Sequence, residues 1–411
     1  MTKGVGIFAA VLFAGIAAAP AAAEVIGTMT PAEPLSEARI AALPAEQRAH
    51  WAEYWRQSQA RLAADKVALA AEREAGRADL GSPPAGTPAS MPLDRDKAWY
   101  ASADARRIAD TIVSFQTPAG GWDKNRDRAG PPRVRGQSWG SVGTIDNGAT
   151  TTELRYLARV QQALPGREGE GYRAAFLKGL RYLLEAQYPN GGWPQIYPLQ
   201  GGYHDALTYN DDALVNVAEL LADIAARQEA FSFVPEALAD EAQGAVDRAV
   251  AVIVRTQVVA GGRRTGWGQQ HDALTLVPVG ARNFEPASLS SSESAALLAF
   301  LMRLDSPTPE AVRAIHAGAA WLEERALRDV EWTEAGPEGR QLRPKPGAGP
   351  LWARFYEIAT MRPIFGDRDK TIHDDVNELS AERRNGYSWF GTAPSRTLVL
   401  YRSWATRHPR K

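Results

Sequence analysis

Beyond Ala98 the chain carries apolar side chains three to four residues apart in a series of segments, a pattern that predicts amphipathic helices. Three of these segments end in a glutamine followed by a glycine-rich turn, and the turns carry Trp122, Trp193 and Trp267. The turns recur at intervals of about 70 residues, enough for two helices and their connections. The pattern therefore predicts a repeated helical hairpin.

A second series of polar segments lies between the tryptophan turns, and each comes directly before an apolar helical run. These segments span residues 144–149, 208–213 and 290–295. The helices that they introduce are expected over residues 150–161, 214–226 and 296–304. Aligned with one another, the segments place Asn147, Asp211 and Glu293 at equivalent positions. A helix N-cap, worth about 1 kcal/mol, needs only one Ser, Thr, Asp or Asn, so capping leaves the doubled polar residues unexplained.

Repeated helical hairpins cannot bury their apolar faces singly, and we therefore predict an all-α fold in which they close into an α/α toroid, or barrel. Equivalent helix starts would then lie at the same end of the toroid, beside the tryptophan turns. The residues expected to meet there are Asp146, Asn147, Asp211, Asp212 and Glu293. The alternative, an open α-solenoid, would spread them along a ridge.

The first 23 residues have the features of a cleavable secretory signal peptide. Lys3 precedes an apolar run over residues 5–19, and three alanines at 21–23 supply the small residues that a signal peptidase requires. We therefore expect a mature protein that begins at Glu24 and is secreted or periplasmic. No later stretch is long and apolar enough to span a bilayer, so we expect no membrane contact in the mature protein.

Residues 24–95 are predicted to form an N-terminal extension that packs outside the main body. Residues 36–73 are rich in Ala, Glu and Arg, with aromatic side chains at loosely helical spacing, which indicates one or two amphipathic helices. The Gly- and Pro-rich residues 81–88 read as a linker. The extension contains no set of catalytic residue types, so we place the catalytic domain at residues 96–405.

Composition limits the available chemistry more than it identifies a partner. The 411 residues have a net charge of -1, with hydrophobic and charged fractions of 45% and 23% that are ordinary for a globular protein. The absence of cysteine excludes thiol catalysis and zinc–thiolate sites. The pairs His204–Asp205 and His271–Asp272 lack a third ligand at metal spacing, so we interpret them as hydrogen-bonding residues of loops.

Two features suggest the chemistry of a site: paired oxygen ligands suggest a cation, and arginines among aromatic residues imply an acidic carbohydrate. Asp146–Asn147 and Asp211–Asp212 offer the hard oxygen ligands that Ca²⁺ prefers, although their spacing alone does not separate a calcium site from capping and surface polarity. Arginines also alternate with aromatic residues over the last third of the chain. The neutral net charge and the expected export argue against nucleic acid, whereas guanidinium forks bind carboxylates and aromatic faces accept sugar rings.

Seven motifs, in this order, resemble polysaccharide lyase family 10, the secreted pectate lyases, and the resemblance covers about residues 98–402. The motifs are GGWDKN at 120–125, TIDNGAT at 144–150, GGWPQIYP at 191–198, TYNDDA at 208–213, ARNFEP at 281–286, WARFYE at 352–357 and RPIF at 362–365. Several long motifs in the same order are far more specific than any one of them.

The resemblance implies an (α/α)3 toroid whose cleft binds polygalacturonate (pectate) and cleaves it by Ca²⁺-assisted anti β-elimination, giving 4,5-unsaturated oligogalacturonides. By motif, the implied calcium ligands are Asp146, Asn147 and Asp211. Arg282 matches the catalytic base, with Glu285 as the nearest rival for that role. The residues expected to bind substrate are Arg354, Arg368, Lys124, Trp193 and Tyr209. We expect a monomer.

Two other functions remain open at this point. A glycoside hydrolase on the same toroid would need two carboxylates about 5 to 9.5 Å apart, a role that Asp146 and Asp211 could fill. A non-catalytic protein that binds acidic polysaccharide would need the aromatic residues and arginines but not Arg282.

Overall fold

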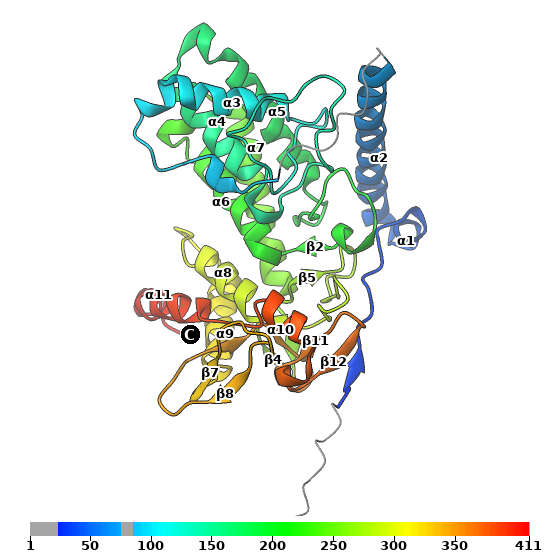
Figure 1. Ribbon diagram of the computed structural model, residues 1–411, viewed down its shortest axis with the longest axis vertical. Coiled ribbons are helices and arrows are strands. Elements are labelled where there is room, and N and C mark those ends of the chain that lie inside the picture. Colours follow the sequence, from blue (N-terminus) through cyan, green and yellow to red (C-terminus); the bar gives the residue numbers. More distant parts are fainter. Residues whose placement is uncertain (1–23, 75–84, 411) are drawn as a thin grey trace, which may run out of the picture.

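The computed structural model describes residues 24–74 and 85–410 (Figure 1). The expected signal peptide and residues 81–84 of the expected linker lie outside this part of the chain. Among the described residues, no helix has the length and apolar character needed to cross a membrane.

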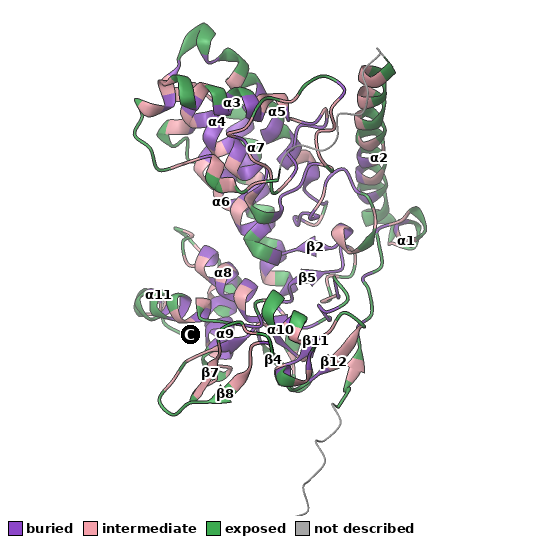
Figure 2. Ribbon diagram, viewed as in Figure 1, coloured by how far each residue is buried: buried purple, intermediate pink, exposed green. Residues whose placement is uncertain are grey.

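The described chain is built mainly from helices. They are α1 (Glu37–Ala41), α2 (Ala45–Glu74), α3 (Ala103–Ser114), α4 (Thr151–Ala163), α5 (Glu170–Ala186), α6 (Ala213–Ala225), α7 (Glu236–Thr256), α8 (Ser291–Leu301), α9 (Pro309–Glu324), α10 (Ala381–Gly386) and α11 (Ala393–Arg407). Helix α4 packs on α5, α6 on α7, and α8 on both α9 and α11. The fold is the all-α toroid of helical hairpins that the repeats predict, and the hairpins bury their facing sides (Figure 2).

The helices expected after the three polar segments are α4, α6 and α8. Helices α4 and α6 begin within one residue of the expected positions, but α8 begins at Ser291, earlier than expected. Its serines bond to groups outside the helix. The Ser291 hydroxyl donates to the Ala353 carbonyl at 2.7 Å, and the Trp267 amide donates to Ser294 Oγ at 2.8 Å. Their side chains therefore do not compete with the helical backbone.

The tryptophan turns are structural joints. In the first of them, Trp122 Nε1 donates to the Ile112 carbonyl of α3 at 2.7 Å, and Gln116 Nε2 donates to the Gly120 and Ala175 carbonyls at 2.8 and 2.9 Å. Gln187 and Gln257 each make the same pair of bonds, one to their own turn and one to a neighbouring helix. Each glutamine therefore fastens two hairpins together, which explains why the sequence repeats it.

The strands are two or three residues long and join loops to one another in antiparallel pairs. Three of the pairs are β2 (Leu207–Thr208) with β5 (Gln270–His271), β6 (Leu289–Ser290) with β10 (Phe355–Tyr356), and β9 (Trp352–Ala353) with β13 (Phe390–Gly391). The others are β1 (Gly27–Thr28) and β11 (Phe365–Gly366), both with β12 (Thr371–His373), then β3 (Val259–Ala260) with β4 (Arg263–Arg264), and β7 (Val330–Trp332) with β8 (Leu342–Pro344). The first three pairs fix the loops that lead into α6, α8 and α11.

The N-terminal extension lies along the outside of the helical body (Figure 1) and also completes its core. Trp51 of α2 is buried against Tyr188, with ring centroids 5.1 Å apart. Tyr54, one turn further along α2, donates a hydrogen bond to the Ala186 carbonyl at 3.0 Å. Strand β1 pairs with β12 near the other end of the chain. The extension is therefore joined to the body through both β1 and α2.

The far end of α2 supports the loop that follows the first tryptophan turn. Asp65 accepts a hydrogen bond from the Ala119 amide at 2.8 Å. Glu72 accepts one from Arg133 at 2.6 Å and one from the Gly136 amide at 2.7 Å. The loop held in this way begins at Lys124 and Asn125, next to the polar segment at 144–149.

Candidate active site

The first two polar segments adopt the same local structure. Each forms a 3₁₀ turn, η3 (Asp146–Gly148) before α4 and η6 (Asn210–Asp212) before α6, and the central residue of each is left-handed, with φ of 53° at Asn147 and 50° at Asp211. No side chain caps the start of α4, α6 or α8. Capping therefore does not explain the acidic and amide groups. The third segment departs from the repeat because Glu293 lies inside the first turn of α8.

The helix starts converge, as the toroid predicts. Asn210 Nδ2 donates to Asp211 Oδ2 at 2.9 Å and lies 3.5 Å from Asp146 Oδ1, so one amide bridges carboxylates from two different repeats. The Asp146 side chain is buried and forms an ion pair with Lys124, whereas the Asp211 side chain is 43% exposed. Asn147 is exposed at the edge of this cluster, where its amide donates to Asn125 at 3.2 Å.

Arg354 closes the cluster from the opposite side. Its Nη2 lies 2.8 Å from Glu293 Oε1, 3.3 Å from Asn210 Oδ1 and 3.4 Å from Asp211 Oδ1. Burial lowers the pKa of Arg354, but the negative charges around it, Glu293 first, raise that pKa by more, so the guanidinium stays charged. The pairing of β6 with β10 holds Arg354 beside the start of α8.

A second group of residues surrounds Arg282. Its Nε and Nη2 donate to the two carboxylate oxygens of Glu285 at 2.8 and 2.5 Å, and its backbone amide donates to the same carboxylate at 3.1 Å. Tyr387 donates to Glu285 at 2.7 Å. The Arg282 side chain is 46% exposed and the Glu285 side chain only 3%. Of this ion pair, Arg282 is the member that solvent or a ligand can reach.

The ion pair shifts the pKa values of both Arg282 and Glu285 in the direction that favours their charged forms. The hydrogen bonds to Glu285 raise the pKa of Arg282 above its usual value. Burial raises the pKa of Glu285, but the Arg282 hydrogen bonds and charge lower it by more, so the net direction is downward. The protein without substrate therefore holds Arg282 as a cation.

Gln269 joins the two groups into one site. Its Nε2 donates to Asn210 Oδ1 at 2.6 Å and lies 3.3 Å from Glu285 Oε1. The site therefore runs without a break from Lys124 and Asp146 to Arg282. Sequence reasoning missed Asn210, Gln269 and Tyr387. Asn210 occupies the position of Asp146 in the aligned repeats, and this signal could have found it.

Arg368 lies beside this site rather than within it. Its side chain is exposed and donates to both carboxylate oxygens of Glu382, at 2.8 and 2.9 Å. Its guanidinium is 5.8 Å from the centre of the Phe284 ring, and that of Arg282 is 4.9 Å from the same ring. Phe284 thus links Arg368 to the edge of the site. Its contact with substrate remains a prediction.

The expectation that Trp193 and Tyr209 bind substrate is wrong, because both side chains are buried in the core. Trp193 Nε1 donates to the Leu183 carbonyl at 2.8 Å, as in the other tryptophan turns. The Tyr209 hydroxyl bonds to Thr256 Oγ1 at 2.6 Å. Motif membership identifies residues that the fold requires as readily as residues that touch a ligand.

We expect Trp193→Ala to lower the free energy of unfolding by about 3–5 kcal/mol, because it removes a fully buried indole from a joint between hairpins. Tyr209→Phe, which removes only the hydroxyl, should leave KM for polygalacturonate unchanged. Denaturant unfolding and steady-state kinetics would measure the two effects. A raised KM in Tyr209→Phe would show that the Tyr209 hydroxyl contributes to substrate binding and would contradict its assignment to the core alone.

Asp205, His271 and Asp272 form hydrogen bonds, as the sequence suggests for the two histidine pairs, and His204 makes a ring contact. His271 is buried; its Nε2 accepts from the Gly268 amide at 3.0 Å, and its Nδ1 lies 2.9 Å from the Leu276 carbonyl. Burial lowers the pKa of His271 to about 4. Asp272 accepts hydrogen bonds from the Leu274 and Thr275 amides. His204 stacks on Tyr203 with ring centroids 4.0 Å apart.

The polar cluster has the donors of a weak calcium site. Among the described residues, no group of three or more His, Cys, Asp or Glu side chains is arranged to hold a metal ion. Asp146 and Asp211 nevertheless present carboxylate oxygens to one shared amide, and the buried Oε1 of Gln269 beside them has no hydrogen-bond partner. These are hard oxygen donors, which suit Ca²⁺, and they are too few for the six to eight that it takes. Substrate and water would have to supply the remainder.

We expect Arg354→Lys to lower turnover about 100-fold, because an ammonium point charge lacks the shape and reach of the guanidinium, whose Nη2 contacts both Glu293 and Asp211. Arg354→Ala should also lower the free energy of unfolding by about 3–5 kcal/mol, since it leaves the buried Glu293 carboxylate unpaired. The exposed Arg343, which contacts Gln341, provides a control as Arg343→Lys. Near wild-type kinetics in Arg354→Lys would reduce Arg354 to a packing role.

Residues 116–398 match the family model described as pectic acid lyase. A solved family 10 polysaccharide lyase from Cellvibrio cellulosa is similar, with 33% identity over 77% of this chain and 97% of its own and a TM-score of 0.68. An aspartate-to-alanine mutant of a family 10 polysaccharide lyase from the same organism, in complex with trigalacturonic acid, has 32% identity over 80% of this chain and 100% of its own, with a TM-score of 0.67. No curated protein matches the chain.

The family match covers more than half of the chain and includes both groups of the site, from Lys124 to Tyr387. It decides between the functions that the sequence leaves open, because neither a glycoside hydrolase nor a non-catalytic binding protein is a lyase. The chain belongs to the pectic acid lyase family and is a polysaccharide lyase.

Proposed function

We propose that this protein cleaves α-1,4-linked polygalacturonate by Ca²⁺-assisted anti β-elimination, with Arg282 as the base. The observation that carries the proposal is the unbroken network from Asp146 through Asn210 and Gln269 to the Arg282–Glu285 pair. Carboxylate oxygens, the buried Arg354 guanidinium and the reachable Arg282 guanidinium lie along this network, which supports the proposal. The trigalacturonic acid complex of the similar Cellvibrio enzyme supports polygalacturonate as the substrate.

The reaction needs positive charge near the uronate carboxylate. The C5 proton is α to that carboxylate and weakly acidic, so removing it creates negative charge that the site must stabilise. Ca²⁺ held by Asp146 and Asp211, with Asn147 nearby, would supply much of that charge when bound. Arg354 contributes a permanent positive charge beside Asp211, and Lys124 contributes another beside Asp146.

Arg282 and Glu285 are the two candidates for removing the proton. Glu285 is buried, has a lowered pKa, and accepts hydrogen bonds from Arg282 and Tyr387. Arg282 is the exposed member of the pair, and this accessibility favours it as the base. In the resting pair it is protonated, so its contact with Glu285 must loosen, and nearby positive charge must lower its pKa, before it accepts the C5 proton.

Removal of the C5 proton leads to elimination because the neighbouring carbon, C4, carries the departing oxygen. The electron pair of the C5–H bond forms the C4=C5 double bond, the C4–O bond breaks, and the departing oxygen takes up a proton. The product is an unsaturated oligogalacturonide that absorbs ultraviolet light. The test is to follow this absorbance with polygalacturonate and with neutral galactan. Reducing ends without absorbance would contradict elimination.

We further propose that residues 1–23 are removed during export, which would place the enzyme where extracellular pectate is available. The run over residues 5–19, preceded by Lys3 and followed by alanines, supports this. N-terminal sequencing of the protein from the periplasm and the medium should give Glu24. An intact Met1 in those fractions would contradict cleavage.

A further inference from the structure

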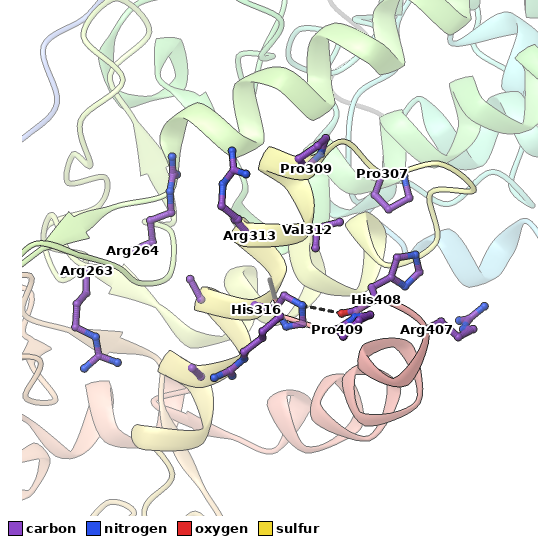
Figure 3. A pocket seen from close by; sticks show the side chains of 13 residues that line it. Arg263, Arg264, Pro307, Pro309, Val312, Arg313, His316, Arg407, His408 and Pro409 are labelled. Carbon is purple, nitrogen blue, oxygen red and sulfur yellow. Dashed lines mark hydrogen bonds between the residues drawn. The ribbon is translucent and has the colours of Figure 1, made fainter.

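A second recess, which we call the arginine pocket, lies between the start of α9, the β3–β4 hairpin and the last residues of the described chain (Figure 3). Its volume is about 700 Å³, within the range of sites that bind small ligands. Five arginines line it: Arg263, Arg264, Arg313, Arg407 and Arg410. They come from three separate parts of the chain, so no charge run in the sequence indicates the site.

The arginine pocket carries more positive charge than its surroundings neutralise. Two of the five arginines have carboxylate partners: Arg263 pairs with Glu324 at 2.8 Å and Arg313 with Glu310 at 2.5 Å. Within residues 24–74 and 85–410, the other three form no ion pair. Arg264 donates to the Val254 carbonyl at 3.2 Å and Arg410 to the Tyr401 hydroxyl at 3.3 Å, and neither acceptor carries a negative charge. Glu323 attracts Arg410 electrostatically without forming an ion pair, so among the described residues the five arginines are set against three carboxylates.

The wall that carries Arg407 and Arg410 is fixed by internal contacts. The buried His316 of α9 bonds through Nδ1 to the Tyr401 hydroxyl at 2.9 Å and through Nε2 to the His408 carbonyl at 2.8 Å (Figure 3). The His408 ring stacks on Trp404, with centroids 4.3 Å apart and planes at 11°. The C-terminal segment is thereby held against α9, so its arginines are presented at a defined place.

The lining combines these charges with an apolar wall. Val312, Ala317 and Ala320 of α9 contribute its small apolar side chains. A uronate sugar has one hydrocarbon face and one carboxylate, which matches an apolar surface bordered by guanidinium forks. We propose that the arginine pocket binds a stretch of polyuronate chain separate from the stretch that is cleaved. The choice of polyuronate rests on the function proposed above.

The arginine pocket is distinct from the candidate active site. Helix α8 begins at the active site with Glu293 and ends at Leu301, shortly before Pro307 of the pocket. Helix α11 packs beside α8, where the Thr397 hydroxyl donates to the Ala295 carbonyl at 3.1 Å, and it ends at Arg407. At 1.5 Å per residue, the 11 residues of α8 separate the two sites by roughly 15 Å.

Two sites on one enzyme affect long and short substrates differently. A polymer held at the arginine pocket raises the local concentration of its other segments near the active site, whereas a trimer is too short to gain from this. The pocket should therefore lower KM for polygalacturonate without changing kcat. Because the attraction is partly electrostatic, added salt should weaken it.

The first test counts binding sites. Trigalacturonate would be titrated calorimetrically into full-length Arg282→Ala protein, and we expect two sites. Adding Arg264→Glu and Arg407→Glu should remove one of them by weakening it at least about tenfold. Arg402→Glu, on the same helix but outside the pocket lining, is the matched control and should keep both. Arg407→Gln alone should weaken the second site if the double variant folds poorly.

The second test is kinetic and uses otherwise wild-type protein. The double variant should show a KM for polygalacturonate raised about threefold to tenfold, with kcat and trigalacturonate turnover unchanged. One site in the parent protein, or two sites that survive the double variant, would overturn the inference. Displacement by inorganic phosphate at equal ionic strength would show a general anion site and overturn the polyuronate assignment.

The outcomes also separate this inference from the proposed function. If the proposed function is wrong, wild-type protein forms no unsaturated product. The double variant then also shows no trigalacturonate binding at the candidate active site. If only the inference fails, turnover and the remaining site are normal while the arginine substitutions change neither stoichiometry nor KM.

Discussion

Arg282→Ala should lower kcat for polygalacturonate by about 10³-fold or more while leaving KM nearly unchanged, because general-base catalysis commonly contributes 10² to 10⁴. The side chain lies at the surface of the site, and its loss removes the proton acceptor without removing Asp146, Asp211 or Arg354. Initial rates of ultraviolet absorbance would give kcat, and calorimetry would give the affinity. Loss of affinity together with turnover would instead make Arg282 a ground-state anchor.

Glu285→Gln distinguishes the two base candidates, because the Glu285 carboxylate raises the pKa of Arg282. If Arg282 is the base, activity depends on its neutral form and rises about tenfold per pH unit below its pKa. Replacing the carboxylate by an amide lowers that pKa, so the alkaline rise should move to lower pH and measurable activity should remain. If Glu285 is the base, the variant should be as inactive as Arg282→Ala.

The pH profile of the wild-type enzyme adds a separate test. Since hydrogen bonds to Glu285 hold Arg282 protonated, the rate should still be climbing well above pH 7. Burial raises the pKa of Glu285 and its Arg282 partner lowers it by more, so as a base Glu285 would give a plateau beginning below pH 7. A plateau of that kind, together with an inactive Glu285→Gln, would reassign the base.

Removal of calcium should abolish turnover and leave the fold intact. The chain offers two carboxylates and nearby amide groups rather than a closed set of ligands, so the free protein should bind the ion weakly and bind it better with substrate present. Excess chelator should therefore stop product formation while circular dichroism and the unfolding midpoint stay constant. Activity that persists in chelator would remove calcium from the mechanism.

Single substitutions of the proposed ligands should resemble partial calcium loss. Asp146→Asn and Asp211→Asn should each raise the calcium concentration needed for half-maximal activity by about 10- to 100-fold, with partial rescue at high calcium. Asp240→Asn, at an exposed position of α7, changes the net charge equally and should have no effect. A calcium requirement that is the same in all three variants would place the ion elsewhere.

The repeats in the sequence predict the fold well because each hairpin needs the same buried tryptophan and the same bridging glutamine where it joins the next hairpin. The helix–glutamine–glycine–tryptophan pattern is visible since every joint needs a buried indole and an amide that bonds across to the next hairpin. Convergence of Asp146 with Asp211 follows from the closure of the repeats. The early start of α8 is not predictable from pattern alone, because the groups that satisfy its serine hydroxyls, such as the Ala353 carbonyl, are distant in sequence.

The candidate site is predictable only in part, for a related reason. A motif gives the identity of a residue but not the direction of its side chain, and so Trp193 and Tyr209 are assigned to a surface that they do not reach. Gln269 carries no distinguishing spacing in the sequence. Its importance comes from reaching both Asn210 and Glu285, which only the folded chain brings to the same amide.

The contacts of α2 have a practical consequence for the boundary drawn at residue 95. Trp51 and Tyr54 cover Tyr188 and Tyr197, with Tyr54 and Tyr197 ring centroids 5.9 Å apart. A shortened protein beginning at residue 96 would present these tyrosines as an aromatic patch to water and would lose the support that Glu72 gives to the loop at 133–136. Such a protein should be recovered mainly in inclusion bodies, and refolding it should require α2 supplied as a separate peptide.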